Sequence, residues 1–180
     1  MAESKVVIGV AGRIGSGKTA VAHHLERASG FRYYRYSLVL AEWFKTDPQC
    51  KAVLQELGWG VMSGDRQREL NRLVIAGMDA DHDCVVDGLR HLIDFESLMS
   101  TFAARFAMAY IEASPESRFK RLSERFTDYE EFLIADSHPV EASIQELKPL
   151  AEIVLNGDLP FPELALQMSA FVTAFRLAQN

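Results

Sequence analysis

The chain has 180 residues with a formal net charge of −6, and 48% of its residues are hydrophobic. That length and composition predict one globular domain, residues 1–180, with a sizeable buried core. The acidic balance argues against non-specific binding to nucleic acid or to membranes. No run approaches the roughly 18 apolar residues that cross a membrane. We therefore expect neither nucleic acid nor a membrane as a partner.

Two cysteines, Cys50 and Cys84, are too few for a disulfide framework, and neither belongs to a metal-binding spacing. The first residues lack the apolar core of a signal peptide. Both observations favour a cytoplasmic protein with reduced thiols. Nothing in the sequence indicates an oligomeric state.

Strands and helices are predicted to alternate along the chain. Five short segments rich in apolar, β-branched or aromatic residues are predicted to be strands: residues 5–11, 31–37, 84–88, 106–113 and 151–157. Helical spacing is found at residues 17–28, 65–78, 94–102, 115–126, 139–150 and 162–178. This order predicts an α/β three-layer sandwich around a central five-stranded parallel sheet.

The segment 38–80 lies between the second and third predicted strands and is helix-like over an unusual length. In an α/β enzyme, such an insertion after the second strand often makes a subdomain that covers the substrate. Plain helical packing explains the same pattern equally well.

A glycine-rich stretch, "GRIGSGKT" at residues 12–19, follows the first predicted strand and opens the first predicted helix. It matches G-x-x-x-x-G-K-[ST], in which glycines bring backbone N–H groups to phosphates and the helix adds its positive N-terminal end. Lys18 is expected to neutralise the β- and γ-phosphates, and Thr19 to offer its hydroxyl to Mg²⁺. The stretch predicts a P-loop nucleotide-binding site. The residues expected to hold the nucleotide are Gly12, Gly15, Ser16, Gly17, Lys18, Thr19 and Ala20.

Asp87 and Arg90, in "VVDGLR", lie where the third predicted strand ends. Ligands of parallel α/β sheets bind at the carboxyl ends of the strands, so Asp87 is expected to face the nucleotide phosphates. There it would hold Mg²⁺ through a water molecule or orient an attacking hydroxyl, while Arg90 would bind a phosphate. A strand-ending aspartate that merely begins a turn is the alternative.

Arg118, Arg121 and Arg125 repeat along one edge of the helix predicted for residues 115–126, which Ser114 is expected to cap. Phosphoryl transfer needs such an array, because charge spreads over the oxygens of the transferring group. A solvated helix face that pairs with glutamates is the alternative. We expect Arg121 and Arg125 to reach phosphate.

Four stretches in this order resemble the P-loop nucleotide kinases: "AGRIGSGKT", "VVDGLRHLIDFESL", "IEASPESRFKRLSER" and "LAEIVLNGD". That group includes adenylate-kinase-like enzymes, dephospho-CoA kinases and deoxynucleoside monophosphate kinases. The resemblance covers nearly the whole chain, although only the first motif is highly specific. It implies the P-loop NTPase fold, with a helical acceptor-binding insertion at residues 38–80 and a small lid at residues 114–138.

The same resemblance implies roles for further residues. Asn156 and Gly157 resemble the loop that edges the adenine base, and Arg121 and Arg125 fall at the start of the lid.

The resemblance also bears on the acceptor. The stretch "LQELGWGVMSGDRQREL" is similar to one in deoxynucleotide kinases, which points to Arg66 or Arg68 as a ligand of the acceptor phosphate. Asp87 and Arg90 lie where such kinases have an Asp-Gly-x-x-Arg or similar element that contacts the same phosphate. A loose similarity of the same stretch to dephospho-CoA kinases leaves the acceptor open. The chain departs from the family at Ser37, where many members place an aspartate, and at Ala135, where relatives often carry arginine.

These features predict an ATP-dependent phosphotransferase that acts on a nucleotide or nucleotide-like small molecule, as nucleoside and deoxynucleoside monophosphate kinases do, and that uses Mg²⁺. The absence of a guanine-reading NKxD motif favours ATP. The alternatives are a dephospho-CoA kinase-like enzyme and a nucleotide-dependent regulatory module with slow hydrolysis. The residues expected to act in catalysis are Lys18, Asp87, Arg121 and Arg125.

Overall fold

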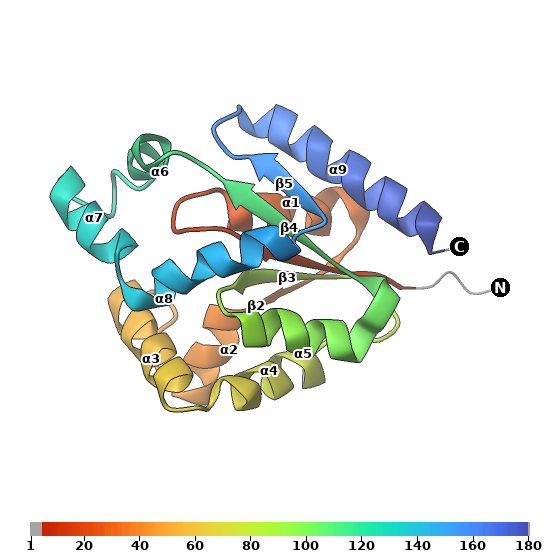
Figure 1. Cartoon of the computed structure of the whole chain (residues 1–180), viewed down its shortest axis with the longest axis horizontal. Helices are drawn as coiled ribbons and strands as arrows, with labels where there is room; N and C mark the ends of the chain where they lie inside the picture. The colour runs from red at the N-terminus through yellow and green to blue at the C-terminus, as the bar shows by residue number, and fades with distance from the viewer. Residues whose placement is uncertain (1–4, 180) are drawn as a thin grey trace.

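A computed structural model describes residues 5–179 of the chain. Its centre is an all-parallel sheet of five strands, as the alternating pattern predicted (Figure 1). The strand order is β2-β3-β1-β4-β5. The strands are β1 (Val7–Ala11), β2 (Arg32–Arg35), β3 (Cys84–Leu89), β4 (Phe106–Glu112) and β5 (Ile153–Asn156).

Hydrophobic clusters on the two faces of the sheet confirm the three layers. On one face, Ile8 packs with α1 (Lys18–Ser29) and α9 (Phe161–Ala178). On the other face, Val7 packs with the insertion and with α5 (Leu92–Phe102). Neighbouring residues of β1 serve opposite cores because successive side chains of a strand point to opposite faces.

The insertion forms three helices, α2 (Tyr36–Trp43), α3 (Lys51–Ser63) and α4 (Gln67–Ala76). Their buried side chains belong to the same hydrophobic cluster as Cys84 and Val86 of β3. The insertion is therefore anchored on one face of the sheet, below it in Figure 1.

Two helix predictions near the lid were wrong in their extent. The helix predicted for residues 115–126 is α6 (Pro115–Arg121), and the following chain turns so that Phe126 can pack with Ile14 in a small separate core. A further lid helix, α7 (Tyr129–Asp136), contributes to that core. The predicted cap is confirmed, since the Ser114 hydroxyl accepts a hydrogen bond from Ser117 N at 3.3 Å.

The helix predicted for residues 139–150 is one short α-helix, α8 (Pro139–Ala142), followed by a 3-10 segment, η2 (Ser143–Leu150). Pro149 lies inside that segment, and a proline cannot donate the backbone hydrogen bond of a regular helix. The strand predicted for residues 31–37 was also too long, because Tyr36 begins α2 and packs in the core.

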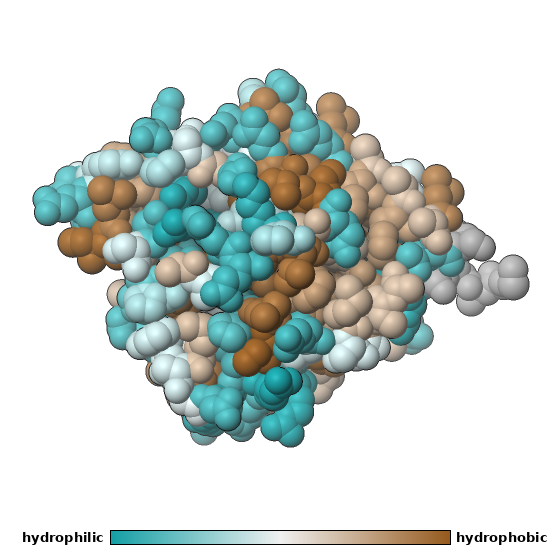
Figure 2. Space-filling model, in the orientation of Figure 1, coloured by the Kyte–Doolittle hydropathy of each residue, from teal (hydrophilic) through white to brown (hydrophobic). Residues whose placement is uncertain are grey.

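No helix within residues 5–179 has both the length and the apolar character needed to cross a membrane. On the face drawn in Figure 2, hydrophobic residues form several separate patches among hydrophilic ones.

Candidate functional site

The loop between β1 and α1 has the conformation that its glycines allow. Gly12 and Gly15 have φ angles of +143° and +77°, which favour glycine. A Cβ at Gly12 would collide with the Ile111 carbonyl oxygen, and one at Gly15 would lie 2.9 Å from the Arg118 carbonyl oxygen. The loop therefore packs against β4 and the lid at two points where no side chain fits.

Lys18 is the first residue of α1, and its side chain folds back over the loop. Its Nζ donates a 2.8 Å hydrogen bond to the Arg13 carbonyl oxygen, and the residue is only 8% exposed. Burial lowers the pKa of Lys18 to about 8, while the nearby Glu141 carboxylate acts in the opposite direction. The amine is thus held at the phosphate-binding loop, in reach of an entering anion.

Asp87 lies near the end of β3 and is almost completely buried. Its Oδ2 atom accepts hydrogen bonds from the Thr19 hydroxyl at 2.8 Å and from the Tyr33 hydroxyl at 2.9 Å. Arg35, its register partner on β2, places Nε 3.6 Å from the same oxygen. The sheet and α1 together bring the Asp87 carboxylate and the Thr19 hydroxyl to the edge of the loop.

The Thr19 hydroxyl and the Asp87 carboxylate are suitable ligands for Mg²⁺. Within residues 5–179, no group of three or more His, Cys, Asp or Glu side chains is placed to hold a metal ion by protein ligands alone. Mg²⁺ commonly takes one or two protein oxygens and completes its shell with water and substrate phosphates. Thr19 and Asp87 fit that mode of binding, with the phosphates supplied by a nucleotide.

A cavity of about 440 Å³ opens beside the loop. Its wall draws on the loop, the insertion, the end of β3 and the lid region, so the predicted insertion and lid both border it. Among the described residues, the wall has more cationic than acidic side chains, although the whole chain is acidic. The cationic ones are Lys18, Arg35, Lys51, Arg90, Arg121 and Arg125, and the acidic ones are Asp87, Asp94 and Glu141.

The insertion gives the cavity an apolar side. The hydrophobic wall residues from α2, α3 and α4 are Leu40, Leu54, Met62 and Leu70. The cavity therefore combines a cationic region near the loop with a region suited to a less polar part of a ligand.

The three lid arginines have three different environments. Arg118 is buried and pairs with Asp136, its Nη2 lying 2.9 Å from Oδ2, and it is not part of the cavity wall. Arg121 donates hydrogen bonds to the carbonyl oxygens of Gly15 and Ser16, each at 3.3 Å, and so lies against the glycine-rich loop after β1.

Arg125 lines the cavity, with its guanidinium 4.9 Å from the centre of the Phe126 ring. Burial lowers the pKa of Arg125, and neighbouring Arg90 acts in the same direction. Arg121 and Arg125 thus both line the cavity.

The residues expected to bind the acceptor divide into two groups. Arg90 lines the cavity and pairs with the carboxylate of Glu141. Arg66 and Arg68 are exposed and are not part of the cavity wall. Arg66 instead lies over the Trp43 ring, with its guanidinium carbon 4.4 Å from the ring centre.

The two residues expected beside the adenine base also lie outside the cavity wall. The Asn156 side chain accepts a hydrogen bond from Asp158 N at 2.9 Å. The Gly157 carbonyl oxygen accepts from Arg121, and a Cβ at Gly157 would lie 2.8 Å from the Ser16 carbonyl oxygen. Gly157 therefore packs directly against the phosphate-binding loop.

Four charged wall residues were not among the expected site residues: Arg35, Lys51, Asp94 and Glu141. Arg35 could have been found by the rule that identified Asp87, because it ends the neighbouring parallel strand. Lys51 and Glu141 have no local sequence signal. They enter the site only through the packing of α3 and α8.

Known proteins resemble this chain in sequence and in fold. No protein-family model matches the chain. A UPF0200 protein of Pyrobaculum aerophilum is 28% identical over 179 residues, which cover 94% of this chain and 98% of that protein.

Solved structures of small-molecule kinases superpose on nearly the whole chain. A gluconokinase from Sinorhizobium meliloti has a TM-score of 0.68 at 11% identity, covering 99% of this chain and 97% of its own. A shikimate kinase from Bacteroides thetaiotaomicron has a TM-score of 0.60 at 14% identity, covering 93% and 98%. Another shikimate kinase, from Acinetobacter baumannii, has a TM-score of 0.58 at 13% identity, covering 96% and 93%. The chain therefore has the fold of the P-loop kinases, as its sequence motifs predicted.

Proposed function

We propose that the protein is an ATP-dependent phosphotransferase that acts on a nucleotide or nucleotide-like small molecule, in the manner of nucleoside or deoxynucleoside monophosphate kinases. The proposal rests on two features that lie side by side, a possible Mg²⁺ site and a cationic cavity. The Thr19–Asp87 hydrogen bond at the phosphate-binding loop lies beside a cavity rich in cationic side chains. A donor site and an acceptor site are thereby adjacent.

On the donor side, backbone N–H groups of the loop and the N-terminus of α1 bind the phosphates of ATP. Lys18 leaves the Arg13 carbonyl oxygen and neutralises the β- and γ-phosphates. Thr19 and Asp87 would hold Mg²⁺, directly and through water respectively. When bound, the ion neutralises charge on the phosphate oxygens.

On the acceptor side, the cationic wall indicates an acceptor with an anionic group. Burial lowers the pKa of Lys51, and the nearby Arg35 and Arg125 lower it further, so these cations repel one another. A phosphate placed among them would relieve that repulsion and form charge-assisted hydrogen bonds. The apolar side of the cavity then accommodates the base or another uncharged part of the acceptor.

Catalysis by such a site is mainly positioning and electrostatic stabilisation. Arg121 and Arg125 neutralise charge that develops on the transferring group. Closure over the cavity is supported by contacts between insertion and lid: Gln55 Nε2 donates to the Ala135 carbonyl oxygen at 3.1 Å, and the His138 ring nitrogen lies 3.2 Å from the Glu56 carboxylate. Water excluded in this way cannot compete with the acceptor.

A coupled ADP-release assay tests the proposal. The purified protein is incubated with MgATP and a panel of ribo- and deoxynucleoside monophosphates, nucleosides and dephospho-CoA. At least one phosphorylated acceptor is expected to raise ADP release well above the rate with water alone. A rate that no acceptor raises would reject the kinase and favour a regulatory module with slow hydrolysis, whereas stimulation by dephospho-CoA alone would identify that acceptor class.

A further inference from the structure

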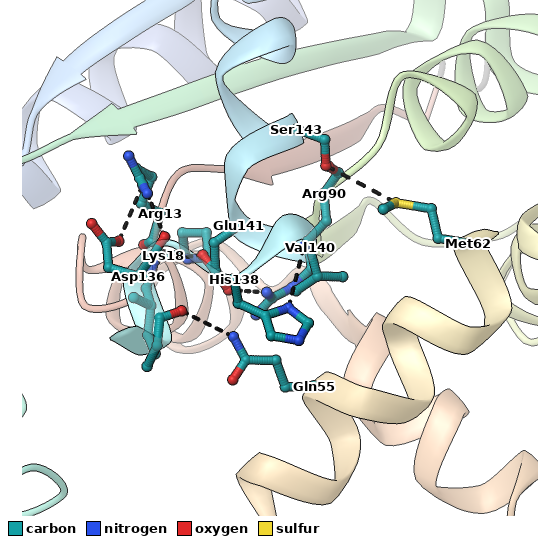
Figure 3. A network of polar contacts seen from close by, with 12 residues as sticks. Arg13, Lys18, Gln55, Met62, Arg90, Asp136, His138, Val140, Glu141 and Ser143 are labelled. Atoms are coloured by element: carbon teal, nitrogen blue, oxygen red, sulfur yellow. Dashed lines mark hydrogen bonds and ion pairs between the residues drawn. The ribbon is translucent and has the colours of Figure 1, made fainter. Parts of the chain in front are cut away.

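Glu141, in the short helix α8, connects two parts of the site that are far apart in sequence. Its Oε2 accepts a 3.0 Å hydrogen bond from Ile14 N in the phosphate-binding loop, and its Oε1 pairs with Arg90 after β3 (Figure 3). The residue is 1% exposed. Glu141 therefore contacts both the donor loop and the arginine expected at the acceptor.

The Glu141 carboxylate is held in its charged form. Burial alone would raise the pKa of Glu141, but Arg90 and Lys18 together hold it below its usual value. Glu141 in turn favours the charged form of Lys18. The ionised and buried Glu141 carboxylate thus interacts with the Ile14 amide and with the cations Arg90 and Lys18.

The chain on either side of Glu141 reinforces both connections. Asp136 pairs with Arg13 of the loop, their Oδ1 and Nε atoms lying 3.1 Å apart. Ser143 donates from Oγ to the Arg90 carbonyl oxygen at 3.1 Å. Residues 136–143, which begin at the end of the predicted lid, therefore contact the loop at one end and Arg90 at the other (Figure 3).

The burial of Glu141 limits what it can do. Although Glu141 belongs to the cavity wall, it is only 1% exposed and presents little surface to a ligand, whereas the Arg90 side chain is 35% exposed. Any influence of Glu141 on a ligand must pass through the groups that it holds. A buried ion pair is weak grounds for a stability role, because apolar residues of similar volume are often as stabilising.

We propose that Glu141 is a positioning residue for phosphoryl transfer, which fixes the Arg90 guanidinium relative to the phosphate-binding loop. The lid, the donor loop and Arg90 then adopt one arrangement together, so that donor and acceptor phosphates are aligned when the lid is docked. The inference rests on the proposed kinase function. It assigns to Glu141 a role in aligning the acceptor rather than in binding ATP.

A double-mutant cycle on the full chain tests the inference, with the variants Glu141→Gln, Arg90→Gln and their combination. Glu141→Gln keeps a side-chain oxygen for Ile14 N but loses the charge that orients Arg90. It is expected to raise the KM of the acceptor about tenfold and to leave the KM of ATP within about twofold. In the Arg90→Gln background, the same substitution should change the acceptor KM little further.

Two further variants guard against a general effect on folding. Glu146→Gln makes the same chemical change at an exposed position of η2, and it should leave both KM values unchanged. Glu141→Asp keeps the charge but shortens the side chain, so an intermediate acceptor KM is expected. It also provides the test if Glu141→Gln does not fold. Independent, multiplying effects of the Glu141 and Arg90 substitutions, or reduced stability with unchanged acceptor KM, would overturn the inference.

A readout without turnover separates this inference from the kinase proposal. In ¹⁵N NMR spectra, the Nη1–H signal of Arg90, the group that pairs with Glu141, is assigned by its loss in Arg90→Gln and should be protected from exchange in the wild type and in Glu146→Gln. It should broaden or vanish in Glu141→Gln. A protected signal in Glu141→Gln would overturn the positioning role even if an acceptor is found. Absence of turnover in the wild type would instead contradict the kinase proposal.

Discussion

The Thr19 hydroxyl donates a 2.8 Å hydrogen bond to the Asp87 carboxylate, which joins the first turn of α1 to the end of β3. The two residues are 68 positions apart in the chain and meet because β1 and β3 are parallel neighbours in the sheet. Parallel strands end at the same edge, so the loop after β1 and the aspartate on β3 share one site.

Replacement of Asp87 by asparagine tests this shared site. The variant keeps the volume and a hydrogen-bond acceptor but loses the charge proposed to hold Mg²⁺ through water. We expect kcat to fall by about 100-fold or more, as when a preorganised electrostatic group is lost, with a much smaller change in nucleotide affinity measured without Mg²⁺. A variant with wild-type kcat would show that Asp87 only supports the turn.

The cationic wall leads to a prediction about the acceptor. Lys51→Gln removes a cation from the cavity and is expected to raise the acceptor KM about tenfold, with little change in the KM of ATP. Arg66→Gln is the matched control, since Arg66 lies over Trp43 outside the cavity wall. A larger acceptor KM in Arg66→Gln than in Lys51→Gln would move the acceptor site to the exposed face of the insertion.

Lys18 gives the protein a pH dependence in alkaline solution. Its pKa in the folded protein is about 8, below the ordinary value of 10.5, so the folded protein binds fewer protons than the unfolded chain between these values. This group therefore makes the free energy of unfolding increase with pH across that window. ATP should restore the charged amine, because phosphate favours the cation.

Calorimetry checks this behaviour of Lys18. At about pH 8.5, MgATP binding should take up protons, so the observed enthalpy should differ between buffers of different ionisation enthalpy. At about pH 7 the amine is already mostly protonated, and the difference should shrink. Lys18→Ala should abolish binding altogether. Equal enthalpies in all buffers at the higher pH would place the amine away from the phosphates.

The Arg118–Asp136 pair leads to a prediction about stability. Both side chains are buried, at 3% and 9% exposure, and Asp136 also pairs with Arg13. Asp136→Asn leaves buried cations without their partner, which should lower the free energy of unfolding by about 3–5 kcal/mol. Urea unfolding measures this change.

An exposed ion pair provides the control for that measurement. Glu112→Gln breaks a pair with Lys148, at 2.7 Å, whose side chains are both largely exposed. Such pairs contribute about 0–1 kcal/mol. If Asp136→Asn is no more destabilising than Glu112→Gln, the lid is not fixed to the loop by Asp136.

The sequence predicted the sheet and located the glycine-rich loop between β1 and α1, because both depend on local patterns. Every residue of the loop lies within "GRIGSGKT", and its flanking strand and helix are marked by their own periodicity. Asp87 could be placed by a general rule about strand ends. These features depend on neighbouring residues or on the topology of any parallel sheet.

The rest of the cavity wall could not be predicted in the same way, because tertiary packing assembles it. Lys51 begins α3 and Glu141 lies in α8, and neither position is distinguished from other charged residues in its segment. A short local similarity points instead to Arg66, which stacks on Trp43. Pro149, which cannot donate a backbone hydrogen bond, lies inside the 3-10 segment that replaces the second part of the helix predicted for residues 139–150.

The most direct test of the central claim is transfer of label from γ-labelled ATP to a nucleoside monophosphate, followed by identification of the product by chromatography and mass spectrometry. We expect wild-type protein to form a labelled acceptor and ADP in equal amounts, and Lys18→Ala to form neither. Label found only in inorganic phosphate, whichever acceptor is present, would contradict the proposal that this cavity binds a phosphoryl acceptor.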